Sequence, residues 1–213
     1  MGSAALLDLI ATDRATAILR TDDQGRARQA MDAAVRGGFK VVEFTLTVPG
    51  VFELIEEFSA REELVVGAGT VLTPEDATRA LDAGASFLVS PVVDEAVIKV
   101  ALDRDAVAMP GVHTPTELLR AHRAGAQLQK LFPAPAGGPA WVRSVLGPMP
   151  FLNIVPTNGT SALNAREWLS AGAFACGFVA SLFDADLVKN ERWDDIEARA
   201  QGILAATRRP DPA

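Results

Sequence analysis

An eightfold alternation of short apolar runs with longer helical segments constrains the fold most. The apolar runs occupy residues 16–20, 41–46, 64–71, 87–90, 106–109, 128–132, 151–155 and 173–177. The segments between them, and one that closes the chain, have the composition and the glycine or cap signals of helices: 24–37, 51–60, 74–83, 94–102, 116–124, 139–146, 161–170 and 193–207. A strand that helices cover on both sides is short and apolar, so the strands are predicted to run parallel.

Eight such units predict an α/β fold, a (β/α)8 barrel of the TIM type. The apolar segment 4–10 precedes the first strand and is expected to form a capping helix. The alternative is an open doubly wound sheet, but Gly67-Ala68-Gly69 lacks the third glycine of a dinucleotide fingerprint. No linker divides the 213 residues, so a single domain over residues 1–213 is expected.

Composition excludes several classes of protein. Hydrophobic residues make up 49% of the chain and charged residues 22%, enough for a sizeable core. No apolar stretch approaches the ~18 residues that span a bilayer, so we expect a cytoplasmic protein without membrane contact. The net charge of −7 argues against a nucleic-acid partner. One cysteine, Cys176, excludes an intrachain disulfide, and two isolated histidines make a metal site unexpected.

Lys130 places an amine within one of the predicted buried strands. In an extended segment Leu128, Lys130 and Phe132 share one face, and Gln129 and Leu131 share the other. Burial disfavours the charged ammonium, and a neutral amine can attack a carbonyl carbon and form a Schiff base. The alternative is a lysine that reaches the sheet edge or pairs with an acid for structural reasons.

Polar residues also mark the ends of other predicted strands, where TIM barrels carry their active sites. They are Arg20, Thr70 and the pair Ser90-Pro91. Glu43 lies within the second strand among apolar residues, and its carboxylate is expected to point into the barrel. Near Lys130 it could move protons during Schiff-base chemistry. Alternatively, Glu43 neutralises Lys130 or Arg20 as a buried structural pair.

The loops after the last two strands are candidates for phosphate binding. Residues 156–161 follow the seventh strand and are expected to run directly into a helix, and residues 177–181 follow the eighth. In TIM barrels, backbone N–H groups of these loops commonly hold phosphate. The alternative is ordinary turn and cap chemistry.

Six motifs stand in a familiar order over about residues 14–208: Glu43-Phe-Thr-Leu-Thr, Gly67-Ala-Gly-Thr-Val-Leu, Ser90-Pro, Met109-Pro-Gly-Val, Lys130-Leu-Phe-Pro-Ala and Pro156-Thr-Asn-Gly. Together they resemble the class I aldolases of the 2-keto-3-deoxy-6-phosphogluconate (KDPG) and 4-hydroxy-2-oxoglutarate (KHG) family. The resemblance implies cleavage of KDPG to pyruvate and glyceraldehyde 3-phosphate by a homotrimer of barrels, with no metal and no organic cofactor.

The same resemblance assigns roles to residues of this chain. Lys130 would form the Schiff base, and Glu43 would shuttle protons. Substrate contacts fall on Arg20, Thr70, Pro91 and Phe132, and phosphate contacts on Thr157, Gly159, Ala180 and Ser181. The rival interpretations are a KHG aldolase, an aldolase for the galactonate epimer of KDPG, and a non-catalytic barrel that serves as an assembly scaffold.

The chain departs from the family pattern at two positions. Many members carry an arginine for the pyruvate carboxylate where this chain has Thr47. One branch instead carries it at the end of the first strand, which Arg20 matches. Asn158 replaces the first glycine of a Pro-Thr-Gly-Gly loop. Asparagine tolerates positive φ better than most residues, so the loop conformation is expected to persist.

Overall fold

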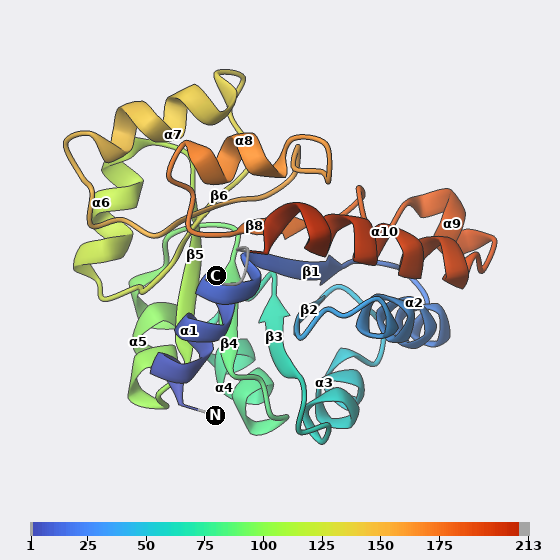
Figure 1. Cartoon of the computed structure of the whole chain (residues 1–213). Helices are drawn as coiled ribbons and strands as arrows, with labels where there is room; N and C mark the ends of the chain where they lie inside the picture. Colours follow the sequence, from blue (N-terminus) through green and yellow to red (C-terminus); the bar gives the residue numbers. More distant parts are fainter. Residues whose placement is uncertain (1, 209–213) are drawn as a thin grey trace.

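The computed structural model describes residues 2–208, in which eight parallel strands form one barrel (Figure 1). The strands are β1 (Ala15–Leu19), β2 (Val41–Thr45), β3 (Val65–Gly69), β4 (Phe87–Ser90), β5 (Val107–Val112), β6 (Gln129–Leu131), β7 (Ile154–Pro156) and β8 (Cys176–Phe178). Each strand from β1 to β6 pairs with the next strand in the sequence, and β8 pairs with β1. A parallel bridge between Thr157 and Gly177 joins the remaining edges. The predicted (β/α)8 barrel is confirmed.

Helices surround the barrel, and several of them begin at side-chain caps. They are α1 (Ser3–Asp13), α2 (Gln24–Arg36), α3 (Val51–Ser59), α4 (Pro74–Asp82), α5 (Glu95–Asp103), α6 (Pro115–Arg123), α7 (Gly138–Leu146), α8 (Ala165–Ser170), α9 (Ala185–Lys189) and α10 (Trp193–Thr207). Asp23, Thr73, Asp94 and Thr114 each accept a hydrogen bond from a first-turn N–H. Among residues 2–208, no helix has the length and apolar character to cross a membrane.

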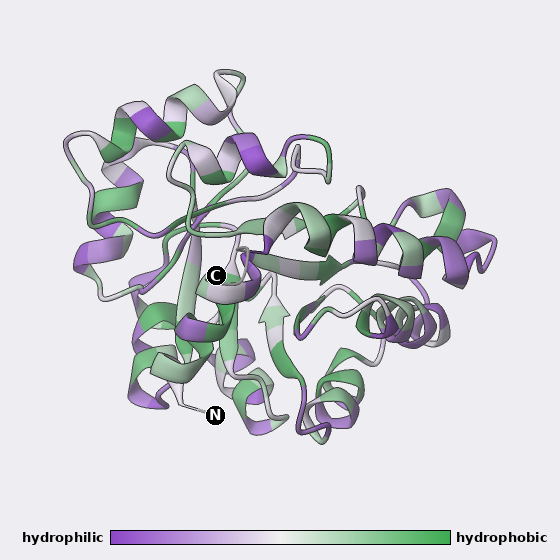
Figure 2. Ribbon diagram, viewed as in Figure 1, coloured by the Kyte–Doolittle hydropathy of each residue, from purple (hydrophilic) through white to green (hydrophobic). Residues whose placement is uncertain are grey.

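Alternation along the strands divides the core into two clusters. On β2, Val42 and Phe44 pack outward against the helices, whereas Val41 points into the barrel. The inner cluster also contains Leu6 and Ile10 of α1, both fully buried. Helix α1 therefore closes the end of the barrel opposite the carboxyl ends of the strands, as the sequence predicts. The helices show both green and purple segments in Figure 2, as expected when one face is buried and the other exposed.

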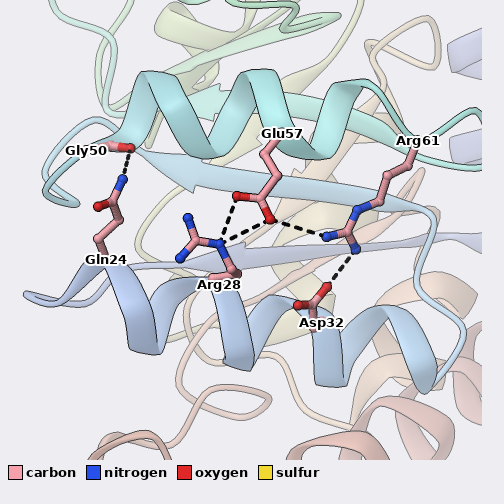
Figure 3. A network of polar contacts seen from close by, with 6 residues as sticks. All are labelled: Gln24, Arg28, Asp32, Gly50, Glu57 and Arg61. Carbon is pink, nitrogen blue, oxygen red and sulfur yellow. Dashed lines mark hydrogen bonds and ion pairs between the residues drawn. The ribbon is translucent and has the colours of Figure 1, made fainter.

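A chain of polar contacts ties α2 to α3 (Figure 3). The Arg28 guanidinium donates to the Glu57 carboxylate at 2.8 Å, and Arg61 donates to Asp32 at 2.6 Å. At the end nearest the barrel mouth, the Gln24 amide donates to the carbonyl oxygen of Gly50 at 3.0 Å. These contacts are partly exposed, so each contributes modestly to stability. The Gln24 bond holds Gly50, the residue that precedes α3.

Several boundaries differ from the sequence prediction. Helix α8 begins at Ala165 rather than at residue 161, because the Asn164 side chain accepts from the N–H of Ser161 and donates to the carbonyl of Gly159, forming a separate turn. The loop after β7 therefore does not run directly into a helix. Strand β5 extends to Val112, β7 and β8 begin later than predicted, and α9 was not predicted.

Candidate functional site

The Glu43 carboxyl group lies inside the barrel with no partner. Its side chain is 0% exposed, and neither oxygen has a hydrogen bond within residues 2–208. Space for it comes from Gly69 on β3, where an added Cβ would overlap the carboxyl oxygen. In the register of the sheet Glu43 pairs with Gly67, and its side chain extends along the strand direction to Gly69, where only a glycine leaves room for it.

Burial raises the pKa of Glu43 above its ordinary value of 4.5, and the positive charges of Lys130 and Arg20 oppose that rise. An unshielded carboxylate in an apolar interior is costly, so the environment favours the protonated acid. The absence of a hydrogen bond to either cation argues against a close structural ion pair. The group is therefore placed to gain and lose a proton, which is what an acid–base catalyst must do.

Lys130 points into the same barrel from β6, but it is less buried than the sequence suggests. Lys130 pairs with Gly111 of β5 and with Val155 of β7. It is partly exposed and not fully buried. Lys130 is the next-to-last residue of its strand, which ends at Leu131. The Lys130 Nζ atom lies 5.3 Å from the centre of the Phe132 ring, which is 38% exposed just beyond the strand. The amine can therefore meet a small molecule.

Arg20 and Thr70 meet at the mouth of the barrel. The Arg20 guanidinium donates to the Thr70 hydroxyl at 3.1 Å. Thr70 has φ +62°, a conformation that is unfavourable for a β-branched residue. Asp23 is occupied as the cap of α2, and the structure gives Arg20 no ion pair with it. An exposed guanidinium held in place by a hydroxyl is suited to a carboxylate.

A groove of about 660 Å³ opens beside this arginine. Arg20 and Thr47 line it on one side, and Phe183, Val188 and Lys189 line it on the other. The Thr47 hydroxyl lies 2.9 Å from that of Thr45. Thr47 lines the same groove as Arg20 but brings no charge to it.

The loops after β7 and β8 lie next to each other across the Thr157–Gly177 bridge. Asn158 has φ +62° and Gly159 has φ +107°, so asparagine holds the left-handed conformation expected for it. In the second loop Ala180 is exposed, and the Ser181 hydroxyl is buried without a partner among the described residues. A buried unpaired hydroxyl is uncommon, and a bound oxyanion would satisfy it.

Pro91 and His113 complete the loops on the other side of the mouth. Pro91 is partly exposed, and its backbone occupies the space that a side chain at Gly111 would need. His113 follows β5, and its Nδ1 lies 3.1 Å from the carbonyl oxygen of Pro133. On the sequence alone, the two histidines are considered only as possible metal ligands, and neither of them is assigned to the site. His113 directly follows the Met109-Pro-Gly-Val motif, and this position was the signal that could have identified it.

Comparison with known proteins gives a consistent result. A family model described as KDPG and KHG aldolase matches residues 8–199. A probable 2-dehydro-3-deoxy-6-phosphogalactonate aldolase of Rhizobium meliloti is 36% identical over 193 residues, 89% of each chain. A 2-dehydro-3-deoxy-phosphogluconate aldolase of Pseudomonas aeruginosa is 33% identical over 94% of this chain and 88% of its own. The solved KDPG aldolase of Legionella pneumophila, with pyruvate captured as a covalent carbinolamine intermediate, is 25% identical with a TM-score of 0.84, over 95% of this chain and 98% of its own.

The raised pKa of Glu43 predicts a specific pH dependence of stability. The folded chain keeps this proton to higher pH than the unfolded chain, so stability falls as pH rises from about 4.5 through the folded pKa, by up to about 1.4 kcal/mol per pH unit. Glu43→Gln removes this loss. In thermal unfolding, the wild-type protein and Glu43→Gln should be equally stable at low pH. As pH rises, the variant should become increasingly more stable than the wild-type protein.

The exposed Glu53, in the first turn of α3, provides the control. Glu53→Gln is the same substitution at an exposed site, and it should show no growing advantage over the wild-type protein as pH rises. A Glu43→Gln difference that stays constant across pH would contradict the assignment of a raised pKa.

Proposed function

The chain belongs to the KDPG and KHG aldolase family, and on that premise we propose that it is a Schiff-base aldolase that cleaves KDPG to pyruvate and glyceraldehyde 3-phosphate. The enzyme is a lyase. One observation supports the mechanism best: the unpartnered Glu43 carboxyl group faces the interior of the barrel that also holds the partly exposed Lys130 amine.

Lys130 begins the proposed reaction by attacking the C2 carbonyl carbon of the substrate. The carbinolamine loses water and becomes an iminium ion. The C3–C4 bond then breaks, its electron pair moves toward the iminium nitrogen to give an enamine, and the C4 hydroxyl proton passes to a base as the aldehyde forms. Protonation of the enamine at C3 and hydrolysis of the iminium release pyruvate and return the free amine.

Glu43 is the proposed carrier of these protons. A carboxyl group whose pKa is raised by burial holds a proton more readily than a solvated one, so it can donate a proton and take it back during the reaction. Because it has no hydrogen bond to break, it is free to bond to the carbinolamine hydroxyl or to the C4 hydroxyl. Phe132 borders the amine, and Pro91 borders the mouth.

Arg20 is proposed to hold the carboxylate of the oxo acid. The net charge of the protein is −7, so an anionic substrate needs a local cation. The hydrogen bond that the guanidinium donates to the Thr70 hydroxyl orients it before substrate arrives. Thr70 is proposed to bind the same carboxylate through its hydroxyl.

The phosphate is proposed to lie against the loops after β7 and β8. Ser181 offers a buried hydroxyl that lacks a partner among the described residues, and Gly159 offers an exposed backbone. Thr157 and Ala180 place the two loops around the same space. The turn before α8 means that loop N–H groups and hydroxyls, rather than the end of a long helix, would supply the donors.

The galactonate epimer of KDPG is a second candidate substrate. The relative from Rhizobium meliloti carries that name, and Arg20 at the end of β1 matches the family branch without arginine at position 47. The epimers differ at one stereocentre, so the same lysine, acid and phosphate loops would serve both. KHG has no phosphate and would leave the Ser181 hydroxyl unpaired.

A cytoplasmic homotrimer is the proposed form of the enzyme. Leu72 and Val92 follow the neighbouring strands β3 and β4, and each is 53% exposed. Their exposure supports burial against a second subunit, because apolar side chains at adjacent strand ends gain stability when covered. Analytical ultracentrifugation of the wild-type protein and of Leu72→Glu would test this assembly.

Borohydride reduction in the presence of pyruvate should attach a stable mass to Lys130, because a reduced imine becomes a secondary amine. Peptide mass spectrometry would locate the adduct. Lys130→Ala should lose both the label and turnover. Labelling of Lys40, Lys99 or Lys189 with Lys130 unmodified would overturn the mechanism.

Arg20→Ala should lower kcat/KM by about 2 kcal/mol of transition-state stabilisation, the scale of a lost charged hydrogen bond. Adding Thr47→Arg should restore part of the loss, because position 47 borders the same groove. Arg26→Ala is the matched control. Arg26 also lines the groove, but its Nε atom lies 3.9 Å from the Glu191 Oε1 atom, so its charge is paired with an acid of the protein. Unchanged catalysis in Arg20→Ala would show that another group holds the carboxylate.

Ser181→Ala should raise KM for phosphorylated substrates by about tenfold or more, the effect of removing a hydrogen bond to a charged group. KM for unphosphorylated KHG should stay within about twofold, measured by coupled pyruvate detection. Ser170→Ala, at the exposed end of α8, should change neither. Equal changes for both substrates would indicate general loop damage instead of phosphate binding.

A further inference from the structure

We infer that His113 is a positioning residue that fixes the segment directly after the catalytic lysine. This inference rests on the proposed role of Lys130. The His113 Nδ1 atom lies 3.1 Å from the carbonyl oxygen of Pro133. A carbonyl oxygen only accepts hydrogen bonds, so the Nδ1 atom must carry the proton in this contact.

The histidine itself is firmly anchored. Its backbone N–H donates to the Glu117 carboxylate at 2.8 Å, and that carboxylate also accepts from the N–H and the hydroxyl of Thr114. These bonds lower the pKa of Glu117, with the bond from His113 the largest cause. The capping box at the start of α6 therefore holds the histidine backbone in place.

The segment that His113 contacts has few other restraints. Strand β6 ends at Leu131, and the N–H of Phe132 donates to the carbonyl of Val112 at 3.0 Å. Pro133 has no N–H to contribute, so its carbonyl oxygen is the backbone group available there for a tie to the loop after β5.

On its other side, the same segment is tied to the loop after β7. The N–H of Ala134 donates to the carbonyl of Asn158 at 3.1 Å. The turn after β6 is thus held between its two neighbours, by His113 on one side and by Asn158 on the other. Loss of either tie would let the turn shift toward the opposite loop.

The position of this turn matters because it carries the Phe132 ring. The Lys130 amine lies 5.3 Å from the centre of that ring. A shift of Pro133 moves the ring and alters both the space and the electrostatic environment of the amine. Displacements of about 1 Å in a reacting group can cost on the order of 10²-fold in rate. His113 therefore acts on the amine through Pro133 and Phe132, without touching substrate.

The experiment compares three proteins in the borohydride trapping reaction with pyruvate. His113→Ala removes the donor and should slow adduct formation at Lys130 and reduce kcat by about tenfold or more. His113→Asn places an amide N–H near the former Nδ1 position and should recover most of that loss. His122 on α6, which packs against the Phe151 ring, provides the matched control, and His122→Ala should trap at the wild-type rate.

Nitrogen-15 NMR of the wild-type protein supplies a readout independent of catalysis. The His113 ring should carry its proton on Nδ1, in contrast to the tautomer usual for a solvated neutral histidine. An unprotonated Nδ1, or equal trapping rates in the wild-type protein and His113→Ala, would overturn the inference. Equal losses in His113→Ala and His113→Asn would also overturn it.

The outcomes separate this inference from the proposed function. Absence of any adduct at Lys130 in the wild-type protein would refute the Schiff-base assignment and leave the NMR result interpretable. A normal wild-type adduct together with an unaffected His113→Ala variant would refute only the positioning role. Thermal unfolding of each variant identifies a failure to fold, in which case the NMR result and His113→Asn decide the question.

Discussion

The interior of the barrel can hold a long acidic side chain only where the neighbouring strand has a glycine, which has no side chain to fill the same space. Gly69 on β3 leaves the space that the Glu43 carboxyl group occupies, and Gly67, one layer below, leaves space for the Phe87 ring. Gly111, the neighbour of Lys130 on β5, leaves room instead for the backbone of Pro91. The polar layer near the mouth therefore depends on backbone positions without a Cβ, and the apolar layer beneath it packs conventionally. This division places the acid and the amine in one shared space.

The mouth of the barrel is built from loops that hold one another. Arg20 bonds to Thr70 across the ends of β1 and β3, and the turn after β6 is bonded on both sides. Further out, the Gln24 amide fixes the carbonyl of Gly50 at the start of α3. Preorganised groups of this kind lose little entropy when a substrate binds, which supports rapid chemistry by a small number of side chains.

Sequence reasoning succeeded where a strict period or a residue's chemistry determines the outcome. The period of two placed Glu43 on the inner face of β2, and the eight apolar runs gave the barrel. It failed where long-range contacts decide. The start of α8 depends on Asn164 bonding back to Gly159, and the hydrogen bond of His113 depends on Pro133 lying nearby in space. Neither of these hydrogen bonds can be deduced from the local sequence around its residues.

Helix α1 has a consequence for how ligands pass through the protein. Leu6 and Ile10 fill the end of the barrel opposite the mouth. Helix α1 therefore closes that end and leaves the mouth open. In the proposed reaction, the oxo-acid fragment stays covalently attached at Lys130 after the carbon bond breaks, while the aldehyde is free. A compartment with one entrance then imposes an order of departure: the aldehyde leaves first and pyruvate second, and in the synthetic direction pyruvate must enter before the aldehyde.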